Sequence, residues 1–140
     1  MKEENELLIR FNSISDGRGE LVALECGRQI PFTVRRVYYM YEVPAGCSRG
    51  YHAHLQLNQL CIALHGSVKM ILDDGVERRE VLLDHPTKAV RIGPGVWREM
   101  HDFSSDCVLM VLADQAYDES DYIRDYDRFL ASVNLRVASQ

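Results

Sequence analysis

The segment RGYHAHLQLNQ, residues 49–59, holds two histidines that could carry out chemistry. His52 and His54 lie two positions apart, and on a β-strand this spacing places both imidazoles on one face. Such a pair can bind a divalent metal. It can also transfer protons, because an unperturbed histidine titrates at about pH 6.5. The rest of the sequence has to decide between these two roles.

Strand-like segments precede and follow the histidine pair. Short apolar runs recur between turn signals such as DDG at 73–75 and GPG at 93–95, and these tripeptides favour tight turns. The pattern predicts an all-β sandwich or barrel. Near the C-terminus, apolar and aromatic residues change to helical spacing. We therefore expect one domain over residues 1–140, with strands over about 8–114 and a short helix over about 121–133.

The composition of the 140-residue chain argues against several classes of function. Hydrophobic residues make up 46% and charged residues 26%, as in ordinary soluble domains. The net charge of −5 argues against nucleic acid binding, which needs a basic surface. No apolar run approaches the about 20 residues of a membrane span, and MKEENELLIR at the N-terminus lacks the apolar core of a signal peptide. We expect a cytoplasmic protein without a membrane or nucleic acid partner.

A small β-barrel with a His-x-His strand and a later Pro-Gly turn resembles the cupin fold, a double-stranded β-helix or jelly roll. Metal-binding cupins are expected to add a glutamate shortly after the histidine pair and a histidine after the Pro-Gly turn. This chain has Gln59 (or Asn58, if the register slips by one residue) and Arg98 at those places. A neutral amide is a poor metal ligand and a guanidinium is none, so the two histidines lack the further ligands of a divalent site. We predict no metal.

Several motifs resemble those of nucleotide-sugar enzymes. DGRGEL at 16–21 and RGYH at 49–52 resemble motifs of the epimerases that make dTDP-rhamnose. A closer resemblance, over nearly the whole chain, is to a sister family, the dTDP-sugar 3,4-ketoisomerases. Its marks are IPFTVRRVYYMYEVP (30–44), RGYHAHLQLNQ (49–59), GSVKMILDDG (66–75), GPGVWREMHDFSSDCVLMVLA (93–113) and YDESDYIRDYDRF (117–129).

This resemblance implies a reaction, the isomerisation of dTDP-4-keto-6-deoxyglucose to the dTDP-3-keto-6-deoxyhexose. A base removes the proton on C3, an enediol forms between C3 and C4, and a proton is delivered to C4. No metal, nicotinamide or flavin cofactor is required, because no net redox change occurs. The resemblance implies that His52 is the base, since it occupies the histidine of the Arg-Gly-x-His motif. His54 would be its partner, moving protons between the sugar oxygens or protonating C4.

The diphosphate of such a substrate needs cations, and arginine gives bidentate contacts to phosphate oxygens. Arg35 and Arg36 would lie on opposite faces of one strand, so one of them is expected to point inward. Arg98 stands where metal cupins keep a histidine, so it is expected to face the interior and to pair with substrate or with a carboxylate such as Asp102. Tyr39 is a candidate for stacking on thymine or bonding to the sugar. The candidate substrate-binding residues are Arg18, Arg36, Arg49, Tyr39, Gln59, Arg98 and Asp102.

Three other functions compete with this interpretation. A 3,5-epimerase would use the same base on both sides of the ketone, but such epimerases are longer and lack the second histidine. The paired histidines, in a predicted polar pocket, argue against a non-enzymatic cupin that binds a nucleotide sugar. A metal-dependent dioxygenase-type cupin is disfavoured by Gln59 and Arg98.

Two further expectations rest on the resemblance. Small cupins commonly pair through their sheets, so we expect a homodimer. A 3-keto sugar is the natural substrate of an aminotransferase, which implies a pathway to a 3-amino-3,6-dideoxyhexose for a lipopolysaccharide, an S-layer glycan or a natural product.

Overall fold

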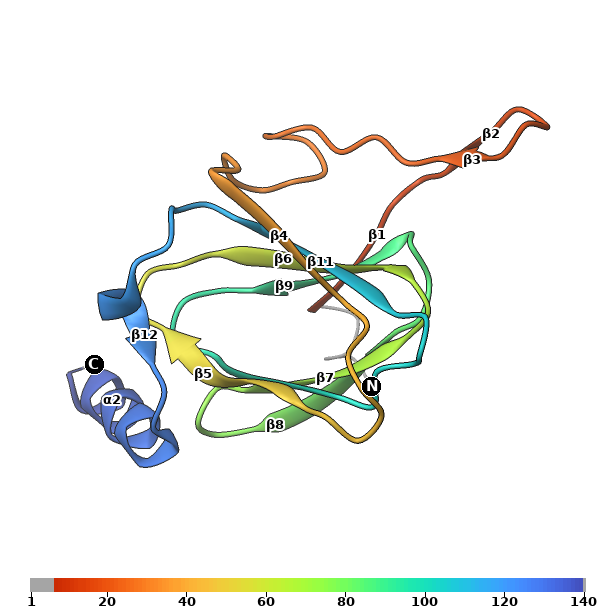
Figure 1. The fold of residues 1–140 in the computed structure, drawn as a ribbon. Coiled ribbons are helices and arrows are strands. Elements are labelled where there is room, and N and C mark those ends of the chain that lie inside the picture. The colour runs from red at the N-terminus through yellow and green to blue at the C-terminus, as the bar shows by residue number, and fades with distance from the viewer. Residues whose placement is uncertain (1–6, 140) are drawn as a thin grey trace.

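Two antiparallel β-sheets face each other in the computed structural model, which describes residues 7–139 (Figure 1). The strand order is β1-β9-β6-β11-β4 in the first sheet and β12-β5-β10-β7-β8 in the second, and β2 and β3 form a separate hairpin. The predicted all-β cupin barrel is confirmed. The strands are β1 (Leu8–Arg10), β2 (Ile14–Ser15), β3 (Glu20–Leu21), β4 (Arg36–Tyr41), β5 (Arg49–His54), β6 (Gln59–His65), β7 (Val68–Asp73), β8 (Arg78–Leu83), β9 (Lys88–Ile92), β10 (Trp97–His101), β11 (Val108–Ala113) and β12 (Tyr122–Ile123).

The hydrophobic core fills most of the space between the two sheets. Alternate residues of β6 and β11, such as Cys61 and Val111, point into it and pack against Met70 and Leu83 of the second sheet. The other faces of β6 and β11 are apolar as well, because the chain before β4 covers them through residues such as Phe32. Strands covered on both faces read as continuous apolar runs, which explains why β6 and β11 are so hydrophobic in sequence.

A short C-terminal helix packs against the second sheet; the sequence predicts this helix, but it begins later than expected. Helix α2 spans Tyr126–Ala138, and the side chain of Asp125 caps it by accepting from the Arg128 amide. The expected start near residue 121 falls instead in a 3₁₀ turn, η1 (Glu119–Asp121), and in β12. Pairing of β12 with β5 holds that segment extended, so the helix begins only after it.

Helix α2 is fixed to the second sheet by a small cluster of its own. Phe129 and Val133 are buried against Trp97 of β10 and Ala53 of β5. The rings of Phe129 and Trp97 lie 5.8 Å apart between centroids. This cluster holds the C-terminal segment, and β12 with it, against the strand that carries the histidine pair.

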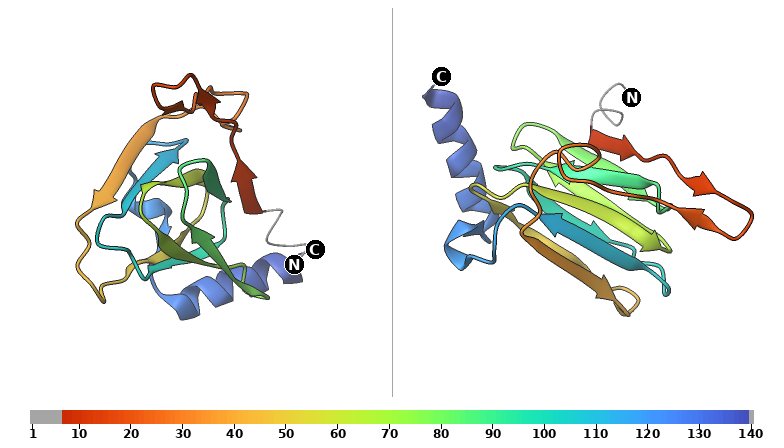
Figure 2. Two further views of the ribbon diagram at one scale, coloured as in Figure 1. Left: turned by 90° about the vertical axis from the view of Figure 1, so that its right-hand side faces the viewer. Right: turned by 90° about the horizontal axis from the view of Figure 1, so that it is seen from above.

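The β2–β3 hairpin projects from the barrel on the side away from α2 (Figures 1 and 2). Its two strands pair only over Ile14–Leu21 and Ser15–Glu20. Ile14 and Leu21 are exposed there. Among residues 7–139, no helix combines the length and hydrophobicity that crossing a bilayer would need.

Replacing Phe129 by alanine should weaken the attachment of α2. The side chain is fully buried, and removing a buried phenylalanine side chain costs about 3–5 kcal/mol through lost burial and the cavity left behind. Urea denaturation followed by circular dichroism measures the change in the free energy of unfolding. Leu135→Ala, at an exposed position of the same helix, is the matched control and should change it by less than about 0.5 kcal/mol. Equal losses in both variants would show that Phe129 does not anchor the helix.

Candidate active site

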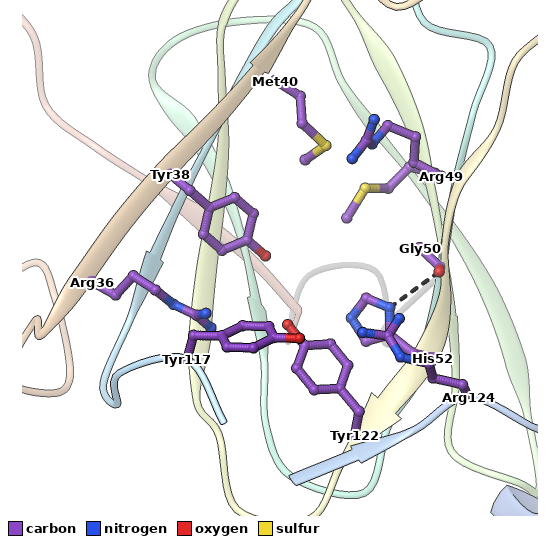
Figure 3. Close-up of a pocket in the computed structure, with 10 residues that line it drawn as sticks. Arg36, Tyr38, Met40, Arg49, Gly50, His52, Tyr117, Tyr122 and Arg124 are labelled. Carbon is purple, nitrogen blue, oxygen red and sulfur yellow. Dashed lines mark hydrogen bonds between the residues drawn. The ribbon is translucent and has the colours of Figure 1, made fainter. Parts of the chain in front are cut away.

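A cavity of about 360 Å³ opens between β4 and β5, where polar side chains replace the apolar core (Figure 3). Strands β4, β5 and β10 supply one part of its wall, and the segment between β11 and α2 supplies the other. It is lined by Arg36, Tyr38, Met40, Arg49, Gly50, His52, Met100, Tyr117, Tyr122 and Arg124.

The Arg-Gly-x-His motif has a structural reason in β5. Gly50 has a φ of +92°, and a Cβ built there would lie 3.0 Å from the backbone oxygen of Arg98. Tyr51 also has a positive φ, of 59°, which is unusual for a residue with a side chain. The carbonyl oxygen of Gly50 lies 3.1 Å from Nδ1 of His52. The glycine therefore allows β10 to approach and its carbonyl orients the histidine.

The two histidines form one aromatic cluster with Tyr122. The ring centroids of His52 and His54 are 4.9 Å apart. The Tyr122 ring lies 4.9 Å from His52 and 4.3 Å from His54. His52 lines the cavity, whereas His54 is 1% exposed and lies deeper. The expectation that both imidazoles share one face of a strand is met.

Burial keeps both imidazoles neutral. It lowers the pKa of His52 to about 4, and the positive charge of Arg98 is the next largest cause. The pKa of His54 is lowered as well, again by burial first and Arg98 second. Two neutral imidazoles can each accept a proton from a bound molecule near pH 7.

A hydrogen-bonded chain runs across the barrel interior behind the histidines. Arg98, 1% exposed, donates to Oε1 of Gln59 and to the carbonyl oxygen of Val96. Nε2 of Gln59 in turn donates to the Tyr38 hydroxyl at 2.9 Å. Burial raises the pKa of Tyr38 to about 12, so the phenol keeps its proton and can donate it in a hydrogen bond.

The amide of Gln59 and the guanidinium of Arg98 thus bond to each other inside the barrel. Within residues 7–139, no three or more His, Cys, Asp or Glu side chains come together as a metal site would need. The side-chain groups of Gln59 and Arg98 near His52 and His54 therefore act as hydrogen-bonding groups.

Six of the predicted site residues lie in or beside the cavity, and three do not. Arg36, Arg49 and His52 line it, and the buried side chains of His54, Gln59 and Arg98 lie beside it. The three residues that the structure places elsewhere are Arg18, Tyr39 and Asp102.

The prediction of Tyr39 conflicts with strand alternation. Arg36, Tyr38 and Met40 face the cavity, so Tyr39 must face outward, and it is 63% exposed. Residues two apart on a strand share a face, so if Arg36 rather than Arg35 points inward, Tyr38 rather than Tyr39 must point inward as well.

Arg18 and Asp102 lie outside the cavity and form ion pairs with neighbouring side chains. The Arg18 side chain lies in the turn of the projecting β2–β3 hairpin and forms a 2.7 Å ion pair with Asp16. Asp102 follows the end of β10 with a φ of +54°. Its carboxylate lies 3.2 Å from Nζ of Lys69, so it does not serve as the partner of Arg98.

The cavity also contains residues that were not predicted. Tyr117, Tyr122 and Arg124 come from YDESDYIRDYDRF (117–129), which overlaps the helix expected over about 121–133. The Arg124 guanidinium lies 4.2 Å from the centre of the Tyr122 ring, and Glu119 fixes it with two hydrogen bonds. The motif resemblance signalled that this segment matters, but its contact with β5 is set by tertiary pairing.

This arrangement matches one known family. A family model described as FdtA: WxcM-like, C-terminal covers residues 4–134. The chain belongs to the FdtA family. This FdtA-family chain is 51% identical over 135 residues to the TDP-4-oxo-6-deoxy-alpha-D-glucose-3,4-oxoisomerase of Aneurinibacillus thermoaerophilus, a match that covers 94% of this chain and 96% of that protein.

Solved structures give the same result. QdtA, a sugar 3,4-ketoisomerase from Thermoanaerobacterium thermosaccharolyticum determined in complex with TDP, is 46% identical with a TM-score of 0.89, over 92% of this chain and 94% of QdtA. A 3,4-ketoisomerase from Helicobacter canadensis is 42% identical with a TM-score of 0.88, over 91% of this chain and 96% of that structure. The predicted kinship of this FdtA-family chain with sugar 3,4-ketoisomerases is confirmed.

Replacing Arg98 by methionine should raise the pKa of His52. The substitution removes the positive charge that is the second largest cause of the lowered pKa, while burial, the largest cause, remains. We expect a pKa above about 4 but still below the usual value of about 6.5. An NMR titration of the His52 ring protons measures it. Arg91→Met, on the exposed surface of β9, should leave the pKa unchanged, and an unchanged pKa in Arg98→Met would contradict the assignment.

Proposed function

We propose that the chain converts dTDP-4-keto-6-deoxyglucose to the dTDP-3-keto-6-deoxyhexose. The observation that carries the proposal is the pair of neutral histidines, with ring centroids 4.9 Å apart, at a cavity bordered by arginines. A keto–keto isomerisation moves one proton between neighbouring carbons and another between neighbouring oxygens, so it needs two proton carriers side by side. The activity named for the 51%-identical relative supports this choice.

In the proposed mechanism His52 is the base. It takes the proton from C3, and the electron pair of that C–H bond forms the C3–C4 double bond of an enediol anion with its charge on O4. The protonated Tyr38 hydroxyl donates a hydrogen bond to this developing charge. His54 takes the O3 proton and delivers it to O4, and the proton on His52 goes to C4. C3 then carries the ketone, and the atoms and charges balance.

Three arginines around the cavity would bind the diphosphate. Arg36, Arg49 and Arg124 line the same cavity as His52 (Figure 3). The Arg36 guanidinium lies 5.3 Å from the Tyr38 ring centre and 5.7 Å from that of Tyr117, and these contacts orient the planar group. Planar, oriented guanidinium groups suit phosphate oxygens. TDP, the ligand of the QdtA structure, fits this chemistry.

The 3,5-epimerase alternative has less support. The 3'-monoepimerase ChmJ from Streptomyces bikiniensis is 18% identical, with a TM-score of 0.73 over 82% of this chain and 66% of ChmJ, a likeness that concerns the fold alone. Epimerisation of C3 and C5 also leaves the ketone in place and gives a second carrier such as His54 no hydroxyl proton to move.

The proposal includes a homodimer in the cytoplasm. The outer face of β4 presents Val37, Tyr39 and Tyr41, which are 53%, 63% and 61% exposed. A row of apolar side chains on an edge strand of a sheet is typical of a surface that pairs with another chain. The 3-keto product would feed an aminotransferase, because a ketone is the group that such enzymes replace with an amine.

The direct test is NMR of the protein with dTDP-4-keto-6-deoxyglucose in D₂O. We expect the ketone carbon signal to move from C4 to C3, because the enediol exposes both carbons to the same base. The C3 proton is lost, and C4 gains protium from His52, or deuterium where the proton on His52 exchanges with solvent before it is delivered. Exchange at C3 and C5 with the ketone remaining at C4 would identify an epimerase. Binding without any exchange would identify a protein that recognises the nucleotide sugar only.

His52→Asn is the matched control for that experiment. Asparagine keeps a polar side chain of similar reach but cannot act as a base, so kcat should fall by at least about 100-fold. Calorimetry should still detect TDP binding, because the arginines are unchanged. Full activity in this variant would contradict the role of His52. It would not contradict the proposed reaction, which the NMR experiment tests.

The homodimer is tested by light scattering after gel filtration. The double variant Tyr39→Ser/Tyr41→Ser should have half the mass of the unchanged protein, because it removes two exposed rings from one face. Leu82→Ser, at an exposed apolar position of β8 in the other sheet, should keep the dimer mass. A monomeric unchanged protein would contradict the expectation.

A further inference from the structure

The segment between β11 and α2 does more than line the cavity, because it lies directly beside the histidine strand. β12 pairs antiparallel with β5, with Tyr122 opposite His54 and Ile123 opposite Ala53. The preceding turn η1 is capped by Asp118, which accepts from the Ser120 amide. This geometry brings the last residue of the turn, Asp121, next to His54, which is 67 positions away in the sequence.

The Asp121 carboxylate is held at both oxygens. Oδ2 lies 3.1 Å from Nδ1 of His54, and Oδ1 accepts from the backbone amide of Gln56 at 2.9 Å. The backbone oxygen of Asp121 also accepts from the Leu55 amide at 2.9 Å. Asp121 is 9% exposed and His54 is 1% exposed, so water competes little with their contact. The carboxylate has one orientation, and it faces the imidazole.

This contact decides which nitrogen of His54 carries the proton. An ionised carboxylate only accepts hydrogen bonds, so Nδ1 of the neutral ring must be the N–H that donates to it. Nε2 is then left with a lone pair. Among residues 7–139, Nε2 is buried and has no hydrogen-bond partner. A buried acceptor without a partner is costly, which indicates a group whose partner arrives with a ligand.

We propose that Asp121 is a positioning residue that fixes His54 as the Nδ1–H tautomer and leaves Nε2 free to accept a proton from bound substrate. The inference rests on the proposed isomerase function and assigns the atom through which His54 would act. When Nε2 takes the O3 proton, the ring becomes an imidazolium, and the adjacent carboxylate stabilises that charge until the proton passes to O4. No proton moves to Asp121 itself.

Asp121→Asn tests the proposal, because it keeps the shape and reverses one hydrogen bond. The amide oxygen can still accept from Gln56, but the amide nitrogen then faces Nδ1 and donates to it. His54 would change to the Nε2–H tautomer and lose its acceptor. We expect kcat to fall by about 100-fold or more with KM changed by less than about threefold, as in other cases where a carboxylate sets a histidine tautomer.

Nitrogen-15 NMR of the His54 ring reads the tautomer directly and does not depend on activity. The unchanged protein should show a protonated Nδ1, and Asp121→Asn a protonated Nε2. A protonated Nε2 in the unchanged protein would overturn the proposal even if the protein isomerises the sugar. A protonated Nδ1 in a protein without isomerase activity would overturn the proposed function and leave the assignment of the tautomer intact.

Asp114→Asn is the matched control, which shows whether loss of a hydrogen-bonded carboxylate lowers kcat merely by destabilising the fold. Asp114 also accepts one backbone amide and one side-chain N–H, both from Asn58, but it does not contact the histidines. It should lower the melting temperature about as much as Asp121→Asn and leave kcat unchanged. Asp121→Glu restores a carboxylate and should recover part of the lost kcat. Equal loss of kcat in Asp114→Asn and Asp121→Asn, or no recovery in Asp121→Glu, would contradict the proposal.

Discussion

A positive charge buried inside the barrel is the constraint on which the rest of the site depends. Arg98 points into the interior and is 1% exposed, where an isolated charge would be very costly. Its hydrogen bonds go to an amide oxygen of Gln59 and a backbone carbonyl of Val96, which satisfy donors without cancelling the charge. Burial lowers the pKa of both histidines, and the field of Arg98 lowers it further. The same field favours an anion, such as an enediolate, in the cavity.

This electrostatic arrangement also links folding to pH. The folded pKa of His52 is about 4, whereas an unfolded histidine titrates at about 6.5. As the pH falls below that unfolded value, His52 becomes protonated in the unfolded chain but stays neutral in the folded chain. Stability is therefore lost as the pH falls from about 6.5 towards about 4. Keeping the imidazole of His52 neutral in the folded state therefore lowers the free energy of unfolding, and this loss grows as the pH falls.

The sequence predicted the barrel strands and their inward-facing residues better than the residues that the C-terminal segment adds to the cavity. The strands follow from short apolar runs and turn tripeptides, His52 and His54 follow from their spacing along a strand, and the resemblance to cupins adds Gln59 and Arg98. These signals are local, because alternation along a strand determines which side chains share a face. Tyr39 faces outward because strand alternation places it on the face opposite to Arg36 and Tyr38, which line the cavity. Arg18 and Asp102 lie outside the cavity of this chain, because nearby charges, Asp16 and Lys69, offer them partners that no periodicity reveals.

The contributions of the C-terminal segment could not be found in this way. Tyr122 and Arg124 reach the cavity because a two-residue strand pairs with β5, and a strand of that length has no periodicity to detect. Helical spacing in the same region favoured one continuous helix from about residue 121. The structure begins α2 at Tyr126, since pairing with β5 outweighs local helical preference before that point.

The attachment of β12 to β5 also makes the site a composite of two parts with separate stabilities. The barrel is held by the large cluster between its sheets, whereas the C-terminal segment depends on the two residue pairs between β12 and β5 and on the small cluster around Phe129. Segments with few buried contacts open locally before the whole domain unfolds. When this segment detaches, Tyr122 and Arg124 leave the cavity and His54 loses its neighbour, while the barrel and His52 remain in place. Such a partly opened molecule keeps nearly all of its β-structure and has no complete active site, so loss of catalysis on heating need not coincide with melting of the fold.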